Sequence, residues 1–269
     1  ALKFTEEKLG LEHPGTADRL NNLAVFLSDK GDYEGAELLY RRALAIREKV
    51  FGPNHKDTAF SLSNLASNLI EQFECEEAER LIRRSLEINE KLFGPEHPST
   101  AGSLSNLAVL LSKKGDYKEV EKLHRRVLKI REKMLGLDHP DTASSVRNLA
   151  VHLSEKGDLH EAEGLYRRAL DIQTLSLGPD HPEIATSLIN FAVFLKNKGD
   201  YGGAEPLYRR AFEIRENVLG PEHPDTIVAL HILGLLLRLK GELYEALKIF
   251  ASLCERYGRL RGQDSLAQS

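Results

Sequence analysis

A glycine recurs every 42 residues along most of the chain, and this spacing constrains the fold more than any other feature of the sequence. A histidine follows three residues after each glycine in the row, which comprises Gly10, Gly52, Gly94, Gly136, Gly178 and Gly220. A fixed period of this length is typical of repeat proteins, in which one repeat cannot bury its own apolar face and must stack on its neighbours. The sequence therefore predicts six repeats without insertions: residues 11–52, 53–94, 95–136, 137–178, 179–220 and 221–258.

Each repeat carries two apolar stripes with helical spacing. In the first repeat, steps of three and four residues connect two sets of side chains: Ala17, Leu20, Leu23, Ala24 and Leu27, then Ala36, Leu39, Tyr40, Ala43 and Leu44. Such spacing places apolar side chains on one face of a helix. No window alternates with a period of two, so we expect no strands. The predicted fold is all-α, a right-handed superhelical solenoid of six helix-turn-helix repeats.

Short turns separate the two helices of each repeat. Gly31 and its counterparts suit the left-handed conformation that often follows a helix end. Phe73 replaces this glycine in the second repeat, and a non-glycine residue in that conformation costs about 1 kcal/mol. We therefore expect that turn to have another shape. Asp32 is expected to cap the helix after it, and Asp158 with Glu161 has the spacing of a capping box.

The two ends of the chain depart from the repeat pattern. Residues 1–10 align with the end of a second helix, so we expect them to be the remnant of a preceding repeat in a longer protein. Residues 259–269 are polar and are expected to form a flexible tail. The first helix of the sixth repeat is apolar nearly all round, so a further segment of the chain is expected to cover it. Alternatively, it is an adhesive end of a binding surface.

The repeats resemble a known family. The pattern Asn-Leu-Ala, then Gly-Asp-Tyr, then Glu-Ala-Glu-x-Leu-Tyr-Arg-Arg-Ala-Leu resembles tetratricopeptide repeats. The 42-residue period, with Leu-Gly-Pro-Glu-His-Pro-Asp-Thr at Leu219–Thr226, is similar to the long subtype found in kinesin light chains. Similar repeats occur in bacterial and fungal signalling proteins, fused to nucleotide-binding switches or caspase-like proteases. The resemblance covers roughly residues 1–258.

An asparagine row is the best functional candidate: Asn22, Asn64, Asn106, Asn148 and Asn190. The resemblance implies that this position lines a concave groove and holds the backbone of an extended peptide. An amide offers a donor and an acceptor to a partner's main chain, and asparagine within a helix costs roughly 0.5 kcal/mol. In the alternative reading, each asparagine bonds the neighbouring repeat and fixes the stacking, or the row is a remnant of repeat duplication.

Further residues are expected to line or border this groove. One turn beyond the asparagines lie Val25, Ser67, Val109, Val151 and Val193, and the borders are expected at Ser63, Ser105, Arg147, Lys113 and Lys196. Relatives that bind chaperone C-termini hold the terminal carboxylate with lysine and arginine at an earlier position. This chain has Asp18, Phe60, Gly102, Ser144 and Thr186 there, so we expect no such clamp. Arg147 and Lys196 are candidates to attract an acidic peptide, or are ordinary solvated charges.

Several other functions are not supported by the sequence. The net charge is −4, and the paired arginines of each second helix follow a glutamate by four residues, so we expect self-neutralised surface and no binding to nucleic acid or membrane. Histidines one repeat apart lie roughly 20 Å apart and cannot share a metal ion; each is better read as a helix-start residue. We find no catalytic motif and expect no cofactor and no enzyme activity. Cys75 and Cys254 indicate a reducing compartment, so a cytoplasmic location is expected.

These observations predict a protein–protein interaction scaffold that binds a peptide segment of a partner in its concave groove. The alternative is a regulatory or sensor arm of a larger signalling protein, packed on other parts of its own chain or on a sister subunit.

Overall fold

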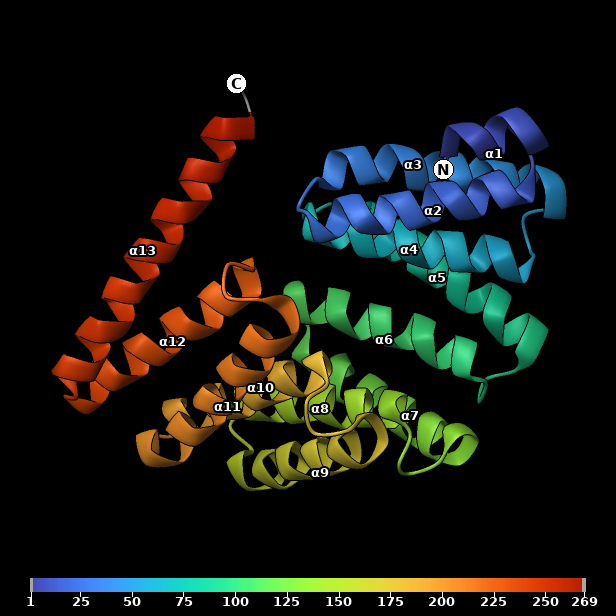
Figure 1. The fold of residues 1–269 in the computed structure, drawn as a ribbon. Coiled ribbons are helices and arrows are strands. Elements are labelled where there is room, and N and C mark those ends of the chain that lie inside the picture. The colour runs from blue at the N-terminus through green and yellow to red at the C-terminus, as the bar shows by residue number, and fades with distance from the viewer. Residues whose placement is uncertain (1, 268–269) are drawn as a thin grey trace. The chain divides into compact units, whose positions relative to one another are not determined.

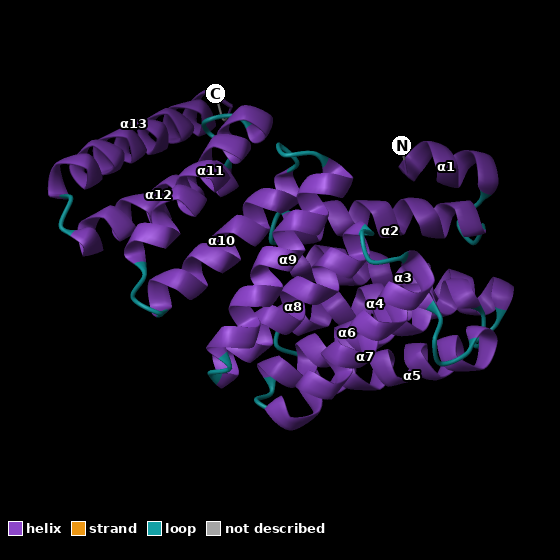
Figure 2. Ribbon diagram, turned by 90° about the horizontal axis from the view of Figure 1, so that it is seen from below, coloured by secondary structure: helices purple, strands orange, loops and turns teal. Residues whose placement is uncertain are grey.

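The computed structural model describes the backbone of residues 2–267 and the side chains of residues 4–258. It contains the helices α1 (Leu2–Leu9), α2 (Pro14–Asp29), α3 (Tyr33–Phe51), α4 (Lys56–Glu71), α5 (Cys75–Phe93), α6 (Pro98–Lys113), α7 (Tyr117–Leu135), α8 (Pro140–Lys156), α9 (Leu159–Leu177), α10 (Pro182–Asn197), α11 (Tyr201–Leu219), α12 (Pro224–Lys240) and α13 (Leu243–Ala267). No strand occurs within these residues (Figure 2), so the predicted all-α repeat fold is confirmed.

The chain divides into two compact blocks, which we call the N-terminal block (Ala1–Met134) and the C-terminal block (Leu135–Ser269). Inside each block, consecutive helices pack as antiparallel hairpins, for example α2 with α3 and α12 with α13 (Figure 1). The hairpins then stack through the second helix of one and the first helix of the next, as α3 does with α4 and α11 with α12. Each block is therefore a run of hairpins in which nearest neighbours supply the packing.

The glycine–histidine spacing has a structural cause at the start of each first helix. The histidine is the N-cap, and its Nδ1 atom accepts a hydrogen bond from the amide two residues later, at 3.0 to 3.3 Å in all six repeats. In the first four repeats, a threonine three residues after the histidine donates its hydroxyl at 2.8 Å to the carbonyl of the preceding glycine. The predicted helix-start role of the histidines is confirmed.

Small side chains allow the helices of a hairpin to approach closely. Ala24, Ala66 and Ala108 on the first helices and Ala36 and Ala78 on the second helices are fully buried. In the N-terminal block these alanines join leucines, isoleucines and valines from α2 to α7 in one continuous core. In the C-terminal block, rings pack between α9 and α10, where Tyr166 stacks on Phe191 with ring centroids 5.4 Å apart.

Charged side chains on the second helices are paired as the sequence predicts. The glutamate that precedes each arginine pair contacts the first arginine within 2.7 to 3.2 Å in all five cases. It also reaches the end of the next first helix: Glu79 contacts Lys114 at 2.6 Å, Glu163 contacts Lys198 at 2.8 Å, and Glu205 contacts Lys240. In these three repeats, the same glutamate therefore pairs with an arginine of its own helix and with a lysine of the next hairpin.

Two predictions about turns and caps were wrong. Phe73 has a φ of +65°, so it adopts the left-handed conformation that glycine adopts in the other repeats. The turn keeps its shape, since the amide of Glu74 bonds the Leu69 carbonyl at 2.9 Å, as Asp32 bonds Leu27. Stacking of the flanking helices thus overrides the local preference of this residue. Asp158 makes no side-chain cap hydrogen bond and instead contacts Lys156 at 2.9 Å, whereas Asp32 caps the Gly35 amide as expected.

The last helix continues past the end predicted for the repeats. α13 runs to Ala267, which makes it longer than α12, with 25 residues against 17. The predicted polar tail, residues 259–269, thus has helical backbone as far as Ala267. Its side chains and its last two residues lie outside the described part, and the flexibility expected there stays a prediction.

Candidate functional site

The asparagine row lies on the first helices, and its side chains are available to a partner in different degrees. Asn22 is exposed, and Asn64, Asn106, Asn148 and Asn190 are half-buried. Within the described residues, the side-chain amides of all but Asn64 have no hydrogen-bond partner. A half-buried amide that lacks partners loses part of its hydration without compensation. Asn106, Asn148 and Asn190 are therefore the groups of the row best placed to accept a ligand.

Asn64 differs from the rest of the row. Its Nδ2 atom donates to Oδ1 of Asn21 on α2 at 2.7 Å. This bond joins two adjacent repeats. Asn64 therefore makes the contact expected under the alternative hypothesis, in which the asparagine stabilises the stacking of neighbouring repeats. Asn64 retains its carbonyl oxygen as an acceptor.

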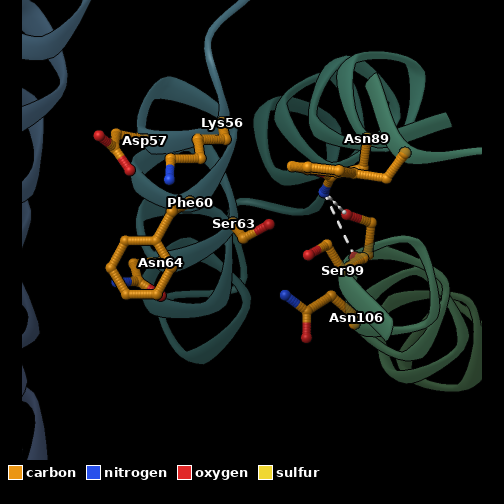
Figure 3. Close-up of a pocket in the computed structure, with 11 residues that line it drawn as sticks. Lys56, Asp57, Phe60, Ser63, Asn64, Asn89, Ser99 and Asn106 are labelled. Atoms are coloured by element: carbon orange, nitrogen blue, oxygen red, sulfur yellow. Dashed lines mark hydrogen bonds between the residues drawn. The ribbon is translucent and has the colours of Figure 1, made fainter. Parts of the chain in front are cut away.

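A pocket of about 410 Å³ opens between α4, α5 and α6 in the N-terminal block. Its lining includes Asn64 and Asn106 from the row, together with Phe60, Asn89, Gly102 and Ser103. Ser63 and Asn106 point into the space between α4 and α6 (Figure 3). Gly102 has no side chain, and a Cβ atom added there would meet nothing within 4 Å. The space beside Gly102 is therefore open. The pocket thus combines two aromatic rings, Phe60 and Phe93, and the charged side chains of Lys56 and Asp57 with amides and hydroxyls. Amides and hydroxyls suit a main-chain segment.

The wall of this pocket is held by hydrogen bonds from the second helix. Asn89 donates from Nδ2 to Ser103 Oγ at 3.0 Å and to the Ser99 carbonyl at 3.3 Å. One repeat earlier, the equivalent residue is Arg47, which donates to Ser61 at 2.7 Å and to Asp18 at 2.6 Å. Asp18 thus pairs with the buried guanidinium of Arg47.

The other predicted residues of the N-terminal block fall into two groups. Val25, Ser67 and Val109 are exposed, and Ser105 is half-buried. Ser63 is engaged with Ser85 Oγ at 2.8 Å, and Lys113 contacts Glu71 at 2.9 Å while lying over the Phe73 ring. Ser67 donates to the Ser63 carbonyl at 3.0 Å, so Ser63, Ser67 and Lys113 already have partners inside the chain.

In the C-terminal block, Val151 and Val193 are half-buried beside the row. Arg147 is half-buried and donates to Ser187 Oγ at 3.2 Å, and burial lowers the pKa of its guanidinium. Lys196 and Val193 line a second pocket, between α10, α11 and α12. The structure brings these two residues together, whereas Arg147 lies on α8 and does not line that pocket.

Sequence reasoning missed several residues that shape the two pockets. Asn89 lies on a second helix, outside the asparagine row, at a position where the first, third, fourth and fifth repeats have arginine or glutamine. In these repeats the position carries a polar side chain within an otherwise apolar face of the second helix. That contrast could have identified Asn89 from the sequence. Phe60 and Gly102 were considered only as the missing clamp, although both line the pocket.

Two wider features of the described residues limit the range of sites. None of the helices is long and apolar enough to cross a membrane within the part of the chain that was searched. No three side chains among histidine, cysteine, aspartate and glutamate gather there in a way that could hold a metal ion.

Comparisons with known proteins place this geometry in a family. The family model for the tetratricopeptide repeat matches residues 15–91, 57–133, 103–175, 141–195 and 183–259. Two crystal structures of nearly identical TPR-like repeats from Podosopora anserina, assigned to a kinesin light chain, match with TM-scores of 0.66 and 0.64 at 25% sequence identity, and the match covers 77% of this chain and 98% of theirs. No curated protein matches the chain.

A bacterial structure has the same fold. BtubC (BKLC) from P. vanneervenii matches with a TM-score of 0.68 at 20% identity, over 93% of this chain and 91% of that chain, a likeness that shows the fold alone. Tetratricopeptide repeats typically form scaffolds for protein–protein interaction and are generally not enzymes. The chain belongs to the tetratricopeptide repeat family, and its repeats are of the kinesin-light-chain-like subtype.

Proposed function

We propose that the chain is an interaction scaffold whose asparagine row binds an extended peptide segment of a partner protein. The observation that carries this proposal is the half-buried amide of Asn106, which lies in the pocket between α4 and α6 without a hydrogen-bond partner among the described residues. Asparagine within a helix costs roughly 0.5 kcal/mol relative to alanine. A bond to the main chain of a peptide would offset that cost.

The pocket supplies the other half of the recognition. Phe60 is half exposed above it, and Gly102 leaves room at the equivalent position of the next repeat. A side chain of the peptide would enter between these two residues, while the amides hold its backbone. Asn148 and Asn190 carry the same chemistry in the C-terminal block, where Arg147 adds positive charge.

The test begins with peptides selected from a random library against the intact chain. Their affinity is then measured by fluorescence anisotropy for the wild type, for Asn106→Ala with Asn148→Ala, and for Gly102→Phe. Loss of one hydrogen bond lowers affinity by about threefold to tenfold. Gly102→Phe should block the pocket in a folded chain, because its Cβ has open space and the preceding repeat has phenylalanine at that position.

The matched control is Asn217→Ala, which removes an exposed amide on α11, outside the row. Circular dichroism should show all variants folded, with the Asn106→Ala, Asn148→Ala double variant at least as stable as the wild type. Unchanged affinities of the selected peptides in both groove variants would refute the proposal. Under the alternative of a regulatory arm, the double variant would instead change the oligomeric state or activity of a longer protein.

A further inference from the structure

The last helix, α13, presents a different surface from the second helices of the other five repeats. Each of those helices carries a glutamate followed four residues later by two arginines, as in Glu79, Arg83 and Arg84. The equivalent residues of α13 are Leu247, Ala251 and Ser252, so none of the three charges is present there. The sixth repeat therefore lacks the glutamate that pairs with the next hairpin elsewhere in the chain.

Uncharged, largely apolar side chains form one continuous stripe along α13. Steps of three and four residues place them on one side of the helix. We call this set the α13 stripe, and it comprises Leu243, Leu247, Ala251, Cys254 and Tyr257. At the position of Tyr257 the other five repeats have arginine, asparagine or glutamine. The sixth repeat thus has an apolar ring where the others have a polar group.

The α13 stripe is exposed. Leu247 is 66% exposed and Tyr257 is 52% exposed, whereas Ala246 and Leu253 on the neighbouring side of α13 are buried, as expected for its packing on α12 (Figure 1). No helix buries the stripe within the described residues. Exposed apolar patches commonly mark protein interfaces.

The equivalent residues of α3 show that this side of a second helix is a packing surface. Glu37, the equivalent of Leu247, accepts a hydrogen bond from Gln72 at 2.9 Å. Arg47, the equivalent of Tyr257, donates to Ser61 at 2.7 Å. Both contacts are made with the next repeat. In α13 the same side has exchanged its polar contacts for apolar surface, which suits an apolar counterpart.

Two charges beside the α13 stripe indicate which counterpart is complementary to it. Lys248 and Glu255 are exposed and lie two turns apart, on the same side of α13. The midpoint between them falls next to Ala251, the middle of the stripe. A second α13 laid antiparallel across this midpoint places its glutamate opposite the lysine, and its lysine opposite the glutamate. A parallel pair would bring like charges together.

We propose that the α13 stripe is a dimer interface at which two copies of this chain pair antiparallel about a two-fold axis. Two-fold dimers use the same patch on both copies, so the patch must be complementary to itself. An uncharged stripe with one lysine and one glutamate beside it satisfies this condition. Leu247 of one copy would pack near Cys254 of the other, and a glutamate at position 247 would be buried there without a partner. The stripe lies on a second helix and the asparagine row on first helices, so the dimer does not depend on peptide binding.

The test measures the mass of the full chain by size-exclusion chromatography with light scattering, at low salt and from about 1 to 100 µM. The wild type is expected to approach twice its chain mass of 30.2 kDa at the upper end. Leu247→Glu restores the residue of the other five repeats at an exposed position, so it should remain folded by circular dichroism. It should weaken dimerisation by about tenfold or more.

A charge exchange tests the antiparallel orientation. Lys248→Glu and Glu255→Lys should each weaken the dimer by about threefold, because each places like charges opposite each other. The two substitutions together should restore the wild-type affinity in an antiparallel pair. No recovery in the double variant would overturn this orientation.

The matched control is Leu38→Glu, which makes the same change at a leucine on α3 that is 71% exposed and lies outside the stripe. This variant should dimerise like the wild type. A wild type that stays monomeric at about 100 µM would overturn the proposal. So would a dimer that Leu247→Glu leaves unchanged, or a mass that grows beyond two chains as the concentration rises, which would indicate head-to-tail association.

Discussion

The left-handed turn at Phe73 gives a prediction whose sign can be worked out in advance. The φ of +65° is a conformation in which a Cβ atom costs about 1–2 kcal/mol. The phenylalanine side chain is 80% exposed and gains little from burial. Its one notable contact is the Lys113 ammonium 5.8 Å from the ring centroid, which contributes about 0.5 kcal/mol at an exposed site. Replacement by alanine removes that contact and keeps the strain, whereas glycine removes both.

The informative comparison is thus Phe73→Gly against Phe73→Ala. Glycine raises the entropy of the unfolded chain and so lowers stability by about 0.4–1 kcal/mol. After subtraction of this entropy cost, the free energy of unfolding of the glycine variant should be larger than that of the alanine variant by roughly 0.5–1 kcal/mol. Gly102 on α6 provides the internal control. It has ordinary helical backbone and open space at its Cβ position, so there alanine should be the more stable residue by about 0.5–1 kcal/mol.

The assay is urea unfolding followed by far-UV circular dichroism, at equal protein concentration for all variants. With a denaturant slope of about 3 kcal/mol per molar, the two residue-73 variants should differ in midpoint by about 0.2–0.3 M. Since repeat proteins lose strict two-state behaviour, hydrogen exchange of the α4 and α5 amides serves as a local readout. An alanine variant at position 73 that is as stable as the glycine variant would refute the strained turn.

Four further predictions concern buried or paired polar groups. Gln173 is fully buried and both polar atoms of its amide have no partner among the described residues, so Gln173→Met should stabilise the chain by about 1–3 kcal/mol, measured by thermal unfolding. Tyr208→Phe should stabilise by about 1 kcal/mol in thermal unfolding, because the buried hydroxyl of Tyr208 has no partner among the described residues, and a loss of stability would contradict this. Burial raises the pKa of Tyr208 to about 12, so stability should fall as pH rises from about 10 to about 12, less steeply in Tyr208→Phe. The hydrogen bond from Lys240 lowers the pKa of Glu205, so its contribution, about 1 kcal/mol or less, should be lost as pH falls below about 4.5 and should be absent in Glu205→Gln.

Much of the fold follows from local spacing in the sequence. Steps of three and four residues fix the helical faces, and the constant distance between glycine and histidine fixes where each first helix begins. The glutamate–arginine pairs could be predicted for the same reason, because both partners lie on one helix. The turn at Phe73 could not, since the packing of α4 against α5 determines its shape and local preference alone indicates the opposite.

The candidate sites depend on residues of different repeats, and this is why only part of them was predicted. The bond between Asn64 and Asn21 joins side chains 43 positions apart and so is outside the reach of a helical pattern. The pocket of the N-terminal block is lined by residues of α4, α5 and α6, among them Phe60 and Gly102, which belong to adjacent repeats.

The ties between hairpins have a consequence for how such a chain can change its length. The same ion pair between neighbouring hairpins occurs at three places: Glu79 with Lys114, Glu163 with Lys198, and Glu205 with Lys240. Gain or loss of a whole 42-residue segment would therefore bring together surfaces that already fit, and no new contact would have to be invented at the junction. A molecule built in this way can acquire longer reach, or a new docking position, in a single genetic step.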